Sequence, residues 1–293
     1  MSDKRVRLVQ TEHGYWRADI DITPAELEAF YNAQYFMPGT DQPGNMYATI
    51  YSADELACKS ADCELTEAAT GLPPGRFLEV GPGEGFFMAH FARRGWTVRG
   101  IDFTDQGIRH YHPELLDRLV LGDLLTLLEA EPAASYDLII CNGVLEHVID
   151  PSHLLRLLGR VVAPGGVLRV AVPNDNSWLQ RMAVAMGRIE DEFWVCPPEH
   201  LSYFTPESLD RLMASEGWKI FDQVAGFPIE LYLLHGGSCY AGDPAKGRES
   251  HLARVAFDSG LYRQGLDKVL AFRRGCAAAG IGRELIVFAR RDG

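Results

Sequence analysis

The feature that most constrains the fold is an alternation of short apolar runs with helical patterns, which begins at Arg76. Such alternation favours βαβ units, whose right-handed crossovers build a mostly parallel sheet with helices on both faces. The loops at the carboxyl ends of these strands then lie along one edge, where ligands bind in open α/β sheets. The apolar runs that predict its first five strands are 77–80, 97–101, 119–121, 136–141 and 167–172.

The chain is expected to divide into a cap or lid segment at 1–70 and a ligand-binding domain at 71–293. Within the domain, the rhythm loosens at 174–205 and 226–282, and we interpret these stretches as largely helical insertions that join the lid. The pattern predicts a hairpin of 6–9 with 15–20, helices at 23–35, 53–69, 86–94, 105–110, 153–162, 178–188, 206–216, 228–235 and 250–274, and closing strands at 218–224 and 283–290.

Charge excludes several classes of partner. The formal net charge is -12 and basic residues form no long run, which argues against nucleic acid and against anionic membranes. No apolar run reaches the length of a membrane span, and the amino-terminal residues lack the core of a signal peptide. None of the six cysteines forms a CxxC motif. We therefore expect reduced thiols in a cytoplasmic protein.

The loop after the first predicted strand carries Gly81, Gly83 and Gly85. A dinucleotide-binding fingerprint needs a small residue where this chain has Phe86, and the Lys-Ser/Thr of a P-loop is missing. Asp102 follows Gly81 by 21 residues at the end of a strand, where a carboxylate can hold ribose hydroxyls. Asp123 follows after another 21 residues and is placed to accept the amino group of an adenine.

The motifs in order resemble those of the class I methyltransferases that use S-adenosylmethionine (SAM), over about residues 76–225 and the final strand. The Leu-Glu-His segment resembles the branch that contains the ubiquinone-biosynthesis O-methyltransferases. The resemblance implies a Rossmann-like, doubly wound α/β fold with seven strands, the last of them antiparallel. The motifs that carry it are Phe77-Leu-Glu-Val-Gly-Pro-Gly-Glu-Gly85, Gly100-Ile-Asp102, Gly122-Asp123, Tyr136-Asp-Leu-Ile-Ile-Cys-Asn-Gly-Val-Leu-Glu-His147 and Ala163-Pro-Gly-Gly166.

The same resemblance implies which residues bind SAM and its product S-adenosylhomocysteine. Glu79 and the three glycines would face the methionine part, and Asn142 would lie near the sulfonium. Asp102 would hold the ribose, and its neighbour Phe103 belongs to the same set. The adenine would meet Asp123 and Leu124. The full set of expected cofactor residues is Glu79, Gly81, Gly83, Gly85, Asp102, Phe103, Asp123, Leu124 and Asn142.

Two histidines are candidates for a general base, because methylation of a hydroxyl benefits from a group that accepts its proton. His147 follows the fourth strand, and His200 lies in a Pro-rich aromatic loop before a helix. The alternative for each is a structural hydrogen bond that only shapes the site. Glu199 and His200 with Asp191 could in principle bind a metal, but their spacing is loose and we expect no metal site.

The acceptor is predicted to be a small polar molecule, methylated on a hydroxyl oxygen. Tyr35, Trp178 and Tyr203 are candidates to bind it, although aromatic residues in such segments also pack helices. The segment from Phe227 to Phe288 is similar to methyltransferases encoded with bacterial polysaccharide or glycosylated-metabolite genes, which suggests a sugar-like acceptor. The alternatives are N-methylation of an amine and a SAM-binding module without catalysis. A monomer or homodimer is expected.

Overall fold

The computed structural model describes residues 6–23, 25–27, 29–30, 50–190 and 192–291. At its centre is a seven-stranded sheet with the order β5-β4-β3-β6-β7-β10-β9. Strand β10 is antiparallel to both of its neighbours, and the other strands run parallel to one another. The expected α/β fold with an antiparallel last strand is therefore confirmed. The strands are β3 (Arg76–Val80), β4 (Thr97–Asp102), β5 (Leu119–Leu121), β6 (Tyr136–Asn142), β7 (Val162–Pro173), β9 (Trp218–Ala225) and β10 (Glu284–Arg291).

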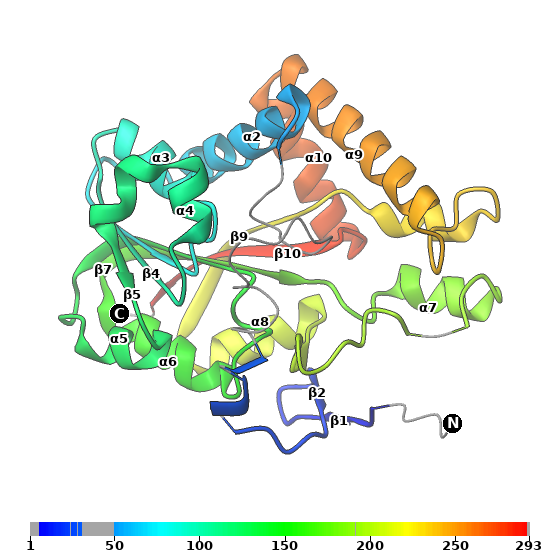
Figure 1. Cartoon of the computed structure of the whole chain (residues 1–293), viewed down its shortest axis with the longest axis horizontal. Helices are drawn as coiled ribbons and strands as arrows, with labels where there is room; N and C mark the ends of the chain where they lie inside the picture. The colour runs from blue at the N-terminus through cyan, green and yellow to red at the C-terminus, as the bar shows by residue number, and fades with distance from the viewer. Residues whose placement is uncertain (1–5, 24, 28, 31–49, 191, 292–293) are drawn as a thin grey trace.

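Helices cover both faces of this sheet (Figure 1). Helices α2, α3 and α10 lie on one face, and α5, α6 and α8 lie on the other. The helices are α2 (Ala53–Thr70), α3 (Phe86–Arg93), α4 (Gln106–Tyr111), α5 (Leu124–Ala130), α6 (Pro151–Val161), α7 (Trp178–Ala185), α8 (Pro206–Ser215), α9 (Pro244–Gln264) and α10 (Leu266–Ala279), with the 3-10 helices η2 (Pro113–Arg118) and η3 (Ile229–Leu234).

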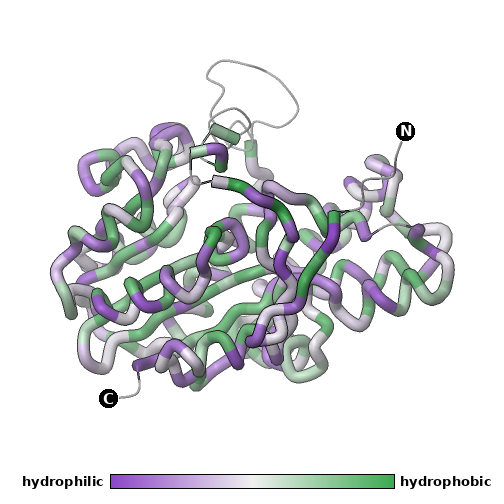
Figure 2. The backbone as a smooth tube through the Cα atoms, turned by 90° about the horizontal axis from the view of Figure 1, so that it is seen from below, coloured by the Kyte–Doolittle hydropathy of each residue, from purple (hydrophilic) through white to green (hydrophobic). Residues whose placement is uncertain are grey.

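Successive side chains of the central strands feed two separate hydrophobic cores, one on each face. In β3, Leu78 and Val80 join the core that α6 covers, whereas Phe77 packs with Met88 of α3 in the other core. All three β3 side chains are fully buried, as expected for a parallel sheet that is covered on both sides. Figure 2 shows hydrophobic residues concentrated in the central strands and hydrophilic ones along the outer helices.

A second, three-stranded sheet joins the amino-terminal hairpin to residues 202–203, in the order β1-β2-β8. The predicted hairpin is present as β1 (Leu8–Gln10) and β2 (Trp16–Ala18), with Gly14 at a φ of 83° in its turn. Strand β8 (Ser202–Tyr203), which was not predicted, pairs with β2. The amino-terminal hairpin therefore supports the loop that carries His200.

Some sequence expectations need correction. The single helix predicted at 250–274 is wrong, because the chain breaks at Gly265, which has a φ of 130° and separates α9 from α10. Helix α5 was not predicted. Helix α7 ends at Ala185, three residues earlier than expected. Within the described ranges, no helix is long and apolar enough to cross a lipid bilayer.

Candidate active site

The glycine loop joins β3 to α3 at the carboxyl edge of the sheet. Gly81, Gly83 and Gly85 have φ values of 68°, 53° and 77°, in the left-handed region that disfavours side chains. A Cβ atom on Gly81 would lie 2.6 Å from Cγ2 of Val144, in the turn that follows β6. The sequence therefore needs glycine here for both its backbone conformation and its close contact with a neighbouring loop.

Two carboxylates flank this loop. Asp102 ends β4, and its Oδ2 accepts a hydrogen bond of 3.2 Å from the Gly83 amide. Burial raises the pKa of Asp102. Glu79 in β3 is only 3% exposed and accepts a 3.0 Å hydrogen bond from the Met88 amide. Burial raises the pKa of Glu79 to about 8, although that hydrogen bond and the charge of Arg169 oppose the shift.

Three more of the expected cofactor residues follow β4 and β5: Phe103 next to Asp102, and Asp123 and Leu124, which were expected around the adenine. Oδ1 of Asp123 accepts hydrogen bonds from the amide of Thr126 at 2.8 Å and from its hydroxyl at 2.6 Å, and so caps α5. Leu124 is buried in the core, and the Phe103 side chain is largely exposed. Contacts of these three residues with a cofactor stay a prediction.

Asn142 ends β6 and is held by a buried arginine that sequence reasoning missed. Arg169 of β7 is 1% exposed and donates one hydrogen bond to Oδ1 of Asn142 and another, of 3.0 Å, to Asp62 of α2. Asp62 also accepts a 2.8 Å hydrogen bond from Arg273 of α10. The available signal was an arginine inside the otherwise apolar run 167–172, which demands a buried partner.

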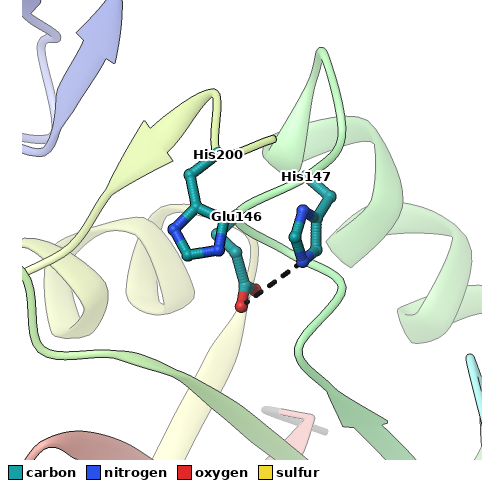
Figure 3. Close-up of side chains that lie close together, drawn as sticks. All are labelled: Glu146, His147 and His200. Atoms are coloured by element: carbon teal, nitrogen blue, oxygen red, sulfur yellow. Dashed lines mark ion pairs between the residues drawn. The ribbon is translucent and has the colours of Figure 1, made fainter. Parts of the chain in front are cut away.

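The two candidate bases lie side by side although 53 positions of sequence separate their loops. The amides of Leu201 and Ser202 donate hydrogen bonds of 2.8 and 3.1 Å to the carbonyl of Glu146, which ties the two loops together. The rings of His147 and His200 are 4.9 Å apart between centroids. Figure 3 shows that both rings and the carboxylate of Glu146 point toward one another.

Burial controls the charge of this Glu146–His147–His200 cluster. It lowers the pKa of His147, and it lowers the pKa of His200 to about 4. It also raises the pKa of Glu146 to about 8. Near neutral pH both imidazoles are therefore uncharged, as a base or a metal ligand requires.

A buried polar network lies behind the cluster. Asp175 follows β7, and its Oδ2 lies 3.9 Å from Nδ1 of His200. Nη1 of Arg283 donates a 3.1 Å hydrogen bond to Asp175 and a 3.4 Å one to Glu230 of η3. Sequence reasoning missed these three residues because they come from distant segments, and none belongs to a motif.

The candidate acceptor-binding aromatics differ in their surroundings. Tyr203 is 1% exposed, and its hydroxyl donates a 2.8 Å hydrogen bond to the carbonyl of His200. This bond gives Tyr203 a direct role in shaping the loop. Trp178 is 45% exposed and donates through its indole to the carbonyl of Ala279. Tyr35 lies outside the described residues, as does Asp191. A role for the three aromatics in acceptor binding stays a prediction.

Comparison with known proteins agrees with this arrangement. A family model described as a methyltransferase domain matches residues 56–223. The ubiquinone biosynthesis O-methyltransferase of Caulobacter sp. (strain K31) is 29% identical over 187 residues, which cover 61% of this chain and 67% of that protein. Its counterpart from Caulobacter vibrioides is 31% identical over 148 residues, 47% of this chain and 57% of that protein. The chain thus spans somewhat over half to two thirds of these relatives.

Among solved structures, one from Burkholderia thailandensis is similar over nearly its whole length. It is a 1,6-didemethyltoxoflavin-N1-methyltransferase with bound 1,6-didemethyltoxoflavin and S-adenosylhomocysteine. The TM-score is 0.53 at 15% sequence identity, and the match covers 98% of this chain and 99% of that one. At this identity the likeness concerns the fold.

Proposed function

Because the chain belongs to the SAM-dependent methyltransferases, we propose that it methylates a hydroxyl oxygen of a small polar acceptor. SAM supplies the methyl group, which its sulfonium activates toward a nucleophile. The protein must then orient the acceptor in line with that methyl group, exclude water, and accept the proton of the hydroxyl. The arrangement of residues at the carboxyl edge of the sheet supports a division of these tasks between two sides of the site.

One side fits SAM. The left-handed glycine loop lets a ligand approach the backbone closely, and the Asp102 carboxylate beside it suits ribose hydroxyls. Glu79 lies under the same loop, where its carboxylate would face the amino group of the methionine part. Asn142, whose amide oxygen is fixed by Arg169, ends the neighbouring strand and would lie near the sulfonium.

The observation that carries the proposal is the Glu146–His147–His200 cluster on the other side. Three groups able to take part in proton removal converge here. Glu146 and His147 follow Val144, whose side chain leaves no room for a Cβ on Gly81, and His200 comes from the loop before β8. A hydroxyl keeps its proton near neutral pH and needs such assistance, whereas an amine loses its proton far more readily. The named relatives, which are O-methyltransferases, agree with an oxygen acceptor.

A sugar-like acceptor fits the same proposal, because its hydroxyls are the groups that the cluster would assist, and a buried polar network lies behind them. Asp175, Glu230 and Arg283 present two carboxylates and one guanidinium behind the cluster. This balance also supports the second candidate, N-methylation, because a surplus of carboxylates suits an acceptor that arrives as an ammonium ion.

A screen with isotopically labelled SAM tests the proposal. Matched acceptor pairs that differ only in a hydroxyl or an amino group, sugars included, would be offered to the enzyme. We expect label on oxygen, and a loss of kcat of about 10²- to 10⁴-fold in His147→Ala or His200→Ala. Binding of S-adenosylhomocysteine should persist in both variants. Full turnover in both variants, or label only on nitrogen, would contradict hydroxyl methylation assisted by this cluster.

A further inference from the structure

The Glu146–His147–His200 cluster and Asp175 behind it hold buried polar atoms that have no hydrogen-bond partner among the described residues. Glu146 and Asp175 are 2% and 1% exposed, and each has one carboxylate oxygen without a hydrogen-bond partner in that part of the chain. Nδ1 of His200 is in the same position. A buried polar atom left unpaired costs about 1–3 kcal/mol, so several of them at one place indicate that something else binds there.

The hydrogen bonding of His147 shows what kind of partner is needed. Its Nδ1 lies 2.5 Å from the carbonyl oxygen of Glu199. A carbonyl can only accept, so Nδ1 carries the proton and Nε2 carries a lone pair. A hydrogen bond from one imidazole nitrogen to a carbonyl is the usual way in which proteins orient a metal-binding histidine.

The other nitrogen of His147 faces a second acceptor. Nε2 lies 3.8 Å from Oε1 of Glu146, which is too long for a hydrogen bond even if the carboxyl is protonated. Two atoms bound to one Zn²⁺ ion at about 2.0–2.2 Å lie roughly 3.3–3.6 Å apart in tetrahedral geometry. The observed separation is close to that spacing, so a small movement of either side chain would let both atoms bind one cation.

His200 completes a set of three ligands. One ligand atom from each residue of the cluster lies within 4.8 Å of the other two. The side chains of His147 and His200 are 22% and 16% exposed, so the cluster can be reached from outside. Asp175, 3.9 Å from Nδ1 of His200, is placed to orient that imidazole from behind.

We propose that Glu146, His147 and His200 bind a divalent transition-metal ion such as Zn²⁺ or Mn²⁺. Two imidazoles and one carboxylate are a common ligand set for such ions, and they leave coordination positions open for an exogenous oxygen. The site differs from the loose Asp191–Glu199–His200 set considered from the sequence. Glu199 contributes through its backbone carbonyl, which holds His147.

The catalytic consequence rests on the proposed function. A hydroxyl bound to the metal ion loses its proton to solvent near neutral pH, because the cation stabilises the alkoxide. The acceptor oxygen then forms a bond to the methyl carbon while the carbon–sulfur bond of SAM breaks and its electron pair stays on sulfur. The two histidines act as ligands in this scheme, and the cluster assists loss of the hydroxyl proton through the bound ion.

The test measures metal binding and turnover separately. The intact protein would be stripped with a chelator and titrated with Zn²⁺, Mn²⁺ and Mg²⁺, and with Co²⁺ as a spectroscopic probe. We expect one equivalent of Zn²⁺ or Co²⁺ per chain, with Co²⁺ absorption in the visible region typical of bound imidazole. Glu146→Gln and His200→Asn should weaken binding at least about tenfold, while His153→Asn, which changes a half-exposed histidine outside the cluster, should leave it unchanged.

The controls separate failure of this inference from failure of the proposed function. Calorimetry with S-adenosylhomocysteine shows whether each variant is folded. Absence of stoichiometric binding, or equal binding by Glu146→Gln, His200→Asn and His153→Asn, would overturn the metal site. Hydroxyl methylation that survives chelation would also overturn the catalytic role of the metal while leaving the proposed function intact. Stoichiometric metal binding by an enzyme that methylates only amines would support the metal site and contradict the proposed methylation of a hydroxyl.

Discussion

At the scale of single residues, Glu79 is a buried acid whose environment favours the neutral form. Its raised pKa of about 8 means that most copies carry a proton at pH 7 when the site holds no ligand. A cationic amino group from the methionine part of a ligand would favour the ionised carboxylate. We therefore predict that binding of S-adenosylhomocysteine at pH 7 releases close to one proton. Calorimetry in two buffers with different ionisation enthalpies measures this number directly.

The number of protons that Glu79 releases on ligand binding should depend on pH. Proton release should fade as the pH rises past 8, because Glu79 is then already ionised before the ligand binds. Glu79→Gln has no proton to lose at this position. It should bind S-adenosylhomocysteine more weakly, and the binding enthalpy should be nearly the same in the two buffers. Equal proton release by Glu79→Gln and the unchanged protein would rule out Glu79 as the source.

Residue identities could be predicted from sequence where a strand end fixes their position. Glu79, Asp102 and Asn142 each lie at or next to the end of an apolar run, so parallel pairing brings them to one edge. The partners Arg283 and Glu230 could not be found in this way. They come from the insertion and from the approach to β10, and only the folded chain places them behind His200.

At the scale of elements, the break between α9 and α10 depends on one glycine. Gly265 has a φ of 130° and a ψ of 150°, a conformation essentially restricted to glycine. We predict that Gly265→Ala lowers the free energy of unfolding by about 2 kcal/mol, measured by urea denaturation. Gly260→Ala is the matched control, because a Cβ there meets open space inside α9 and should be neutral or slightly stabilising. Equal effects of the two substitutions would refute this account.

The same break shows why parts of the fold escaped prediction. Helical periodicity continues across 250–274, and a glycine inside such a pattern is often tolerated, as Gly260 is within α9, so the sequence does not reveal the change of direction at Gly265. Strand β8 has only two residues, which is too short for an alternating pattern to appear in the sequence, and it pairs with β2. Helix α2, in contrast, was predicted closely, at 53–69 against the observed Ala53–Thr70, and in the structure Ser52 and Glu55 form a capping box at its start.

At the scale of the whole molecule, one buried ion cluster connects three elements. Asp62 of α2 binds Arg169 of β7 and Arg273 of α10, and burial leaves Arg169 with almost no access to water. Asp62→Ala removes the carboxylate and leaves a buried guanidinium uncompensated. We predict a loss of about 3 kcal/mol in the free energy of unfolding, measured by denaturant titration at pH 7, together with weaker cofactor binding through Asn142. Asp117→Ala, at an exposed ion pair, should change little.

At low pH, Asp62 should contribute less to the free energy of unfolding. Burial alone would raise the pKa of its carboxyl, but the charges of Arg169 and Arg273 outweigh burial and lower it. A lowered pKa stabilises the folded protein above the usual value of an aspartate, and this stabilisation is lost as the pH falls through the lowered pKa. The difference in the free energy of unfolding between the unchanged protein and Asp62→Ala should therefore become smaller at low pH. A difference that stays constant down to pH 2 would contradict the ionic origin of the effect.

The place of β10 in the sheet has a consequence for biosynthesis. This strand comes after all the others in the chain, yet it lies between β7 and β9. While a ribosome is still making the insertion at 226–282, β7 has an open edge and β9 has no neighbour with which to pair. Translation proceeds at about 5–20 residues per second, so a nascent chain keeps these two strand edges exposed for several seconds. That interval is when a chaperone would be of most use to this protein.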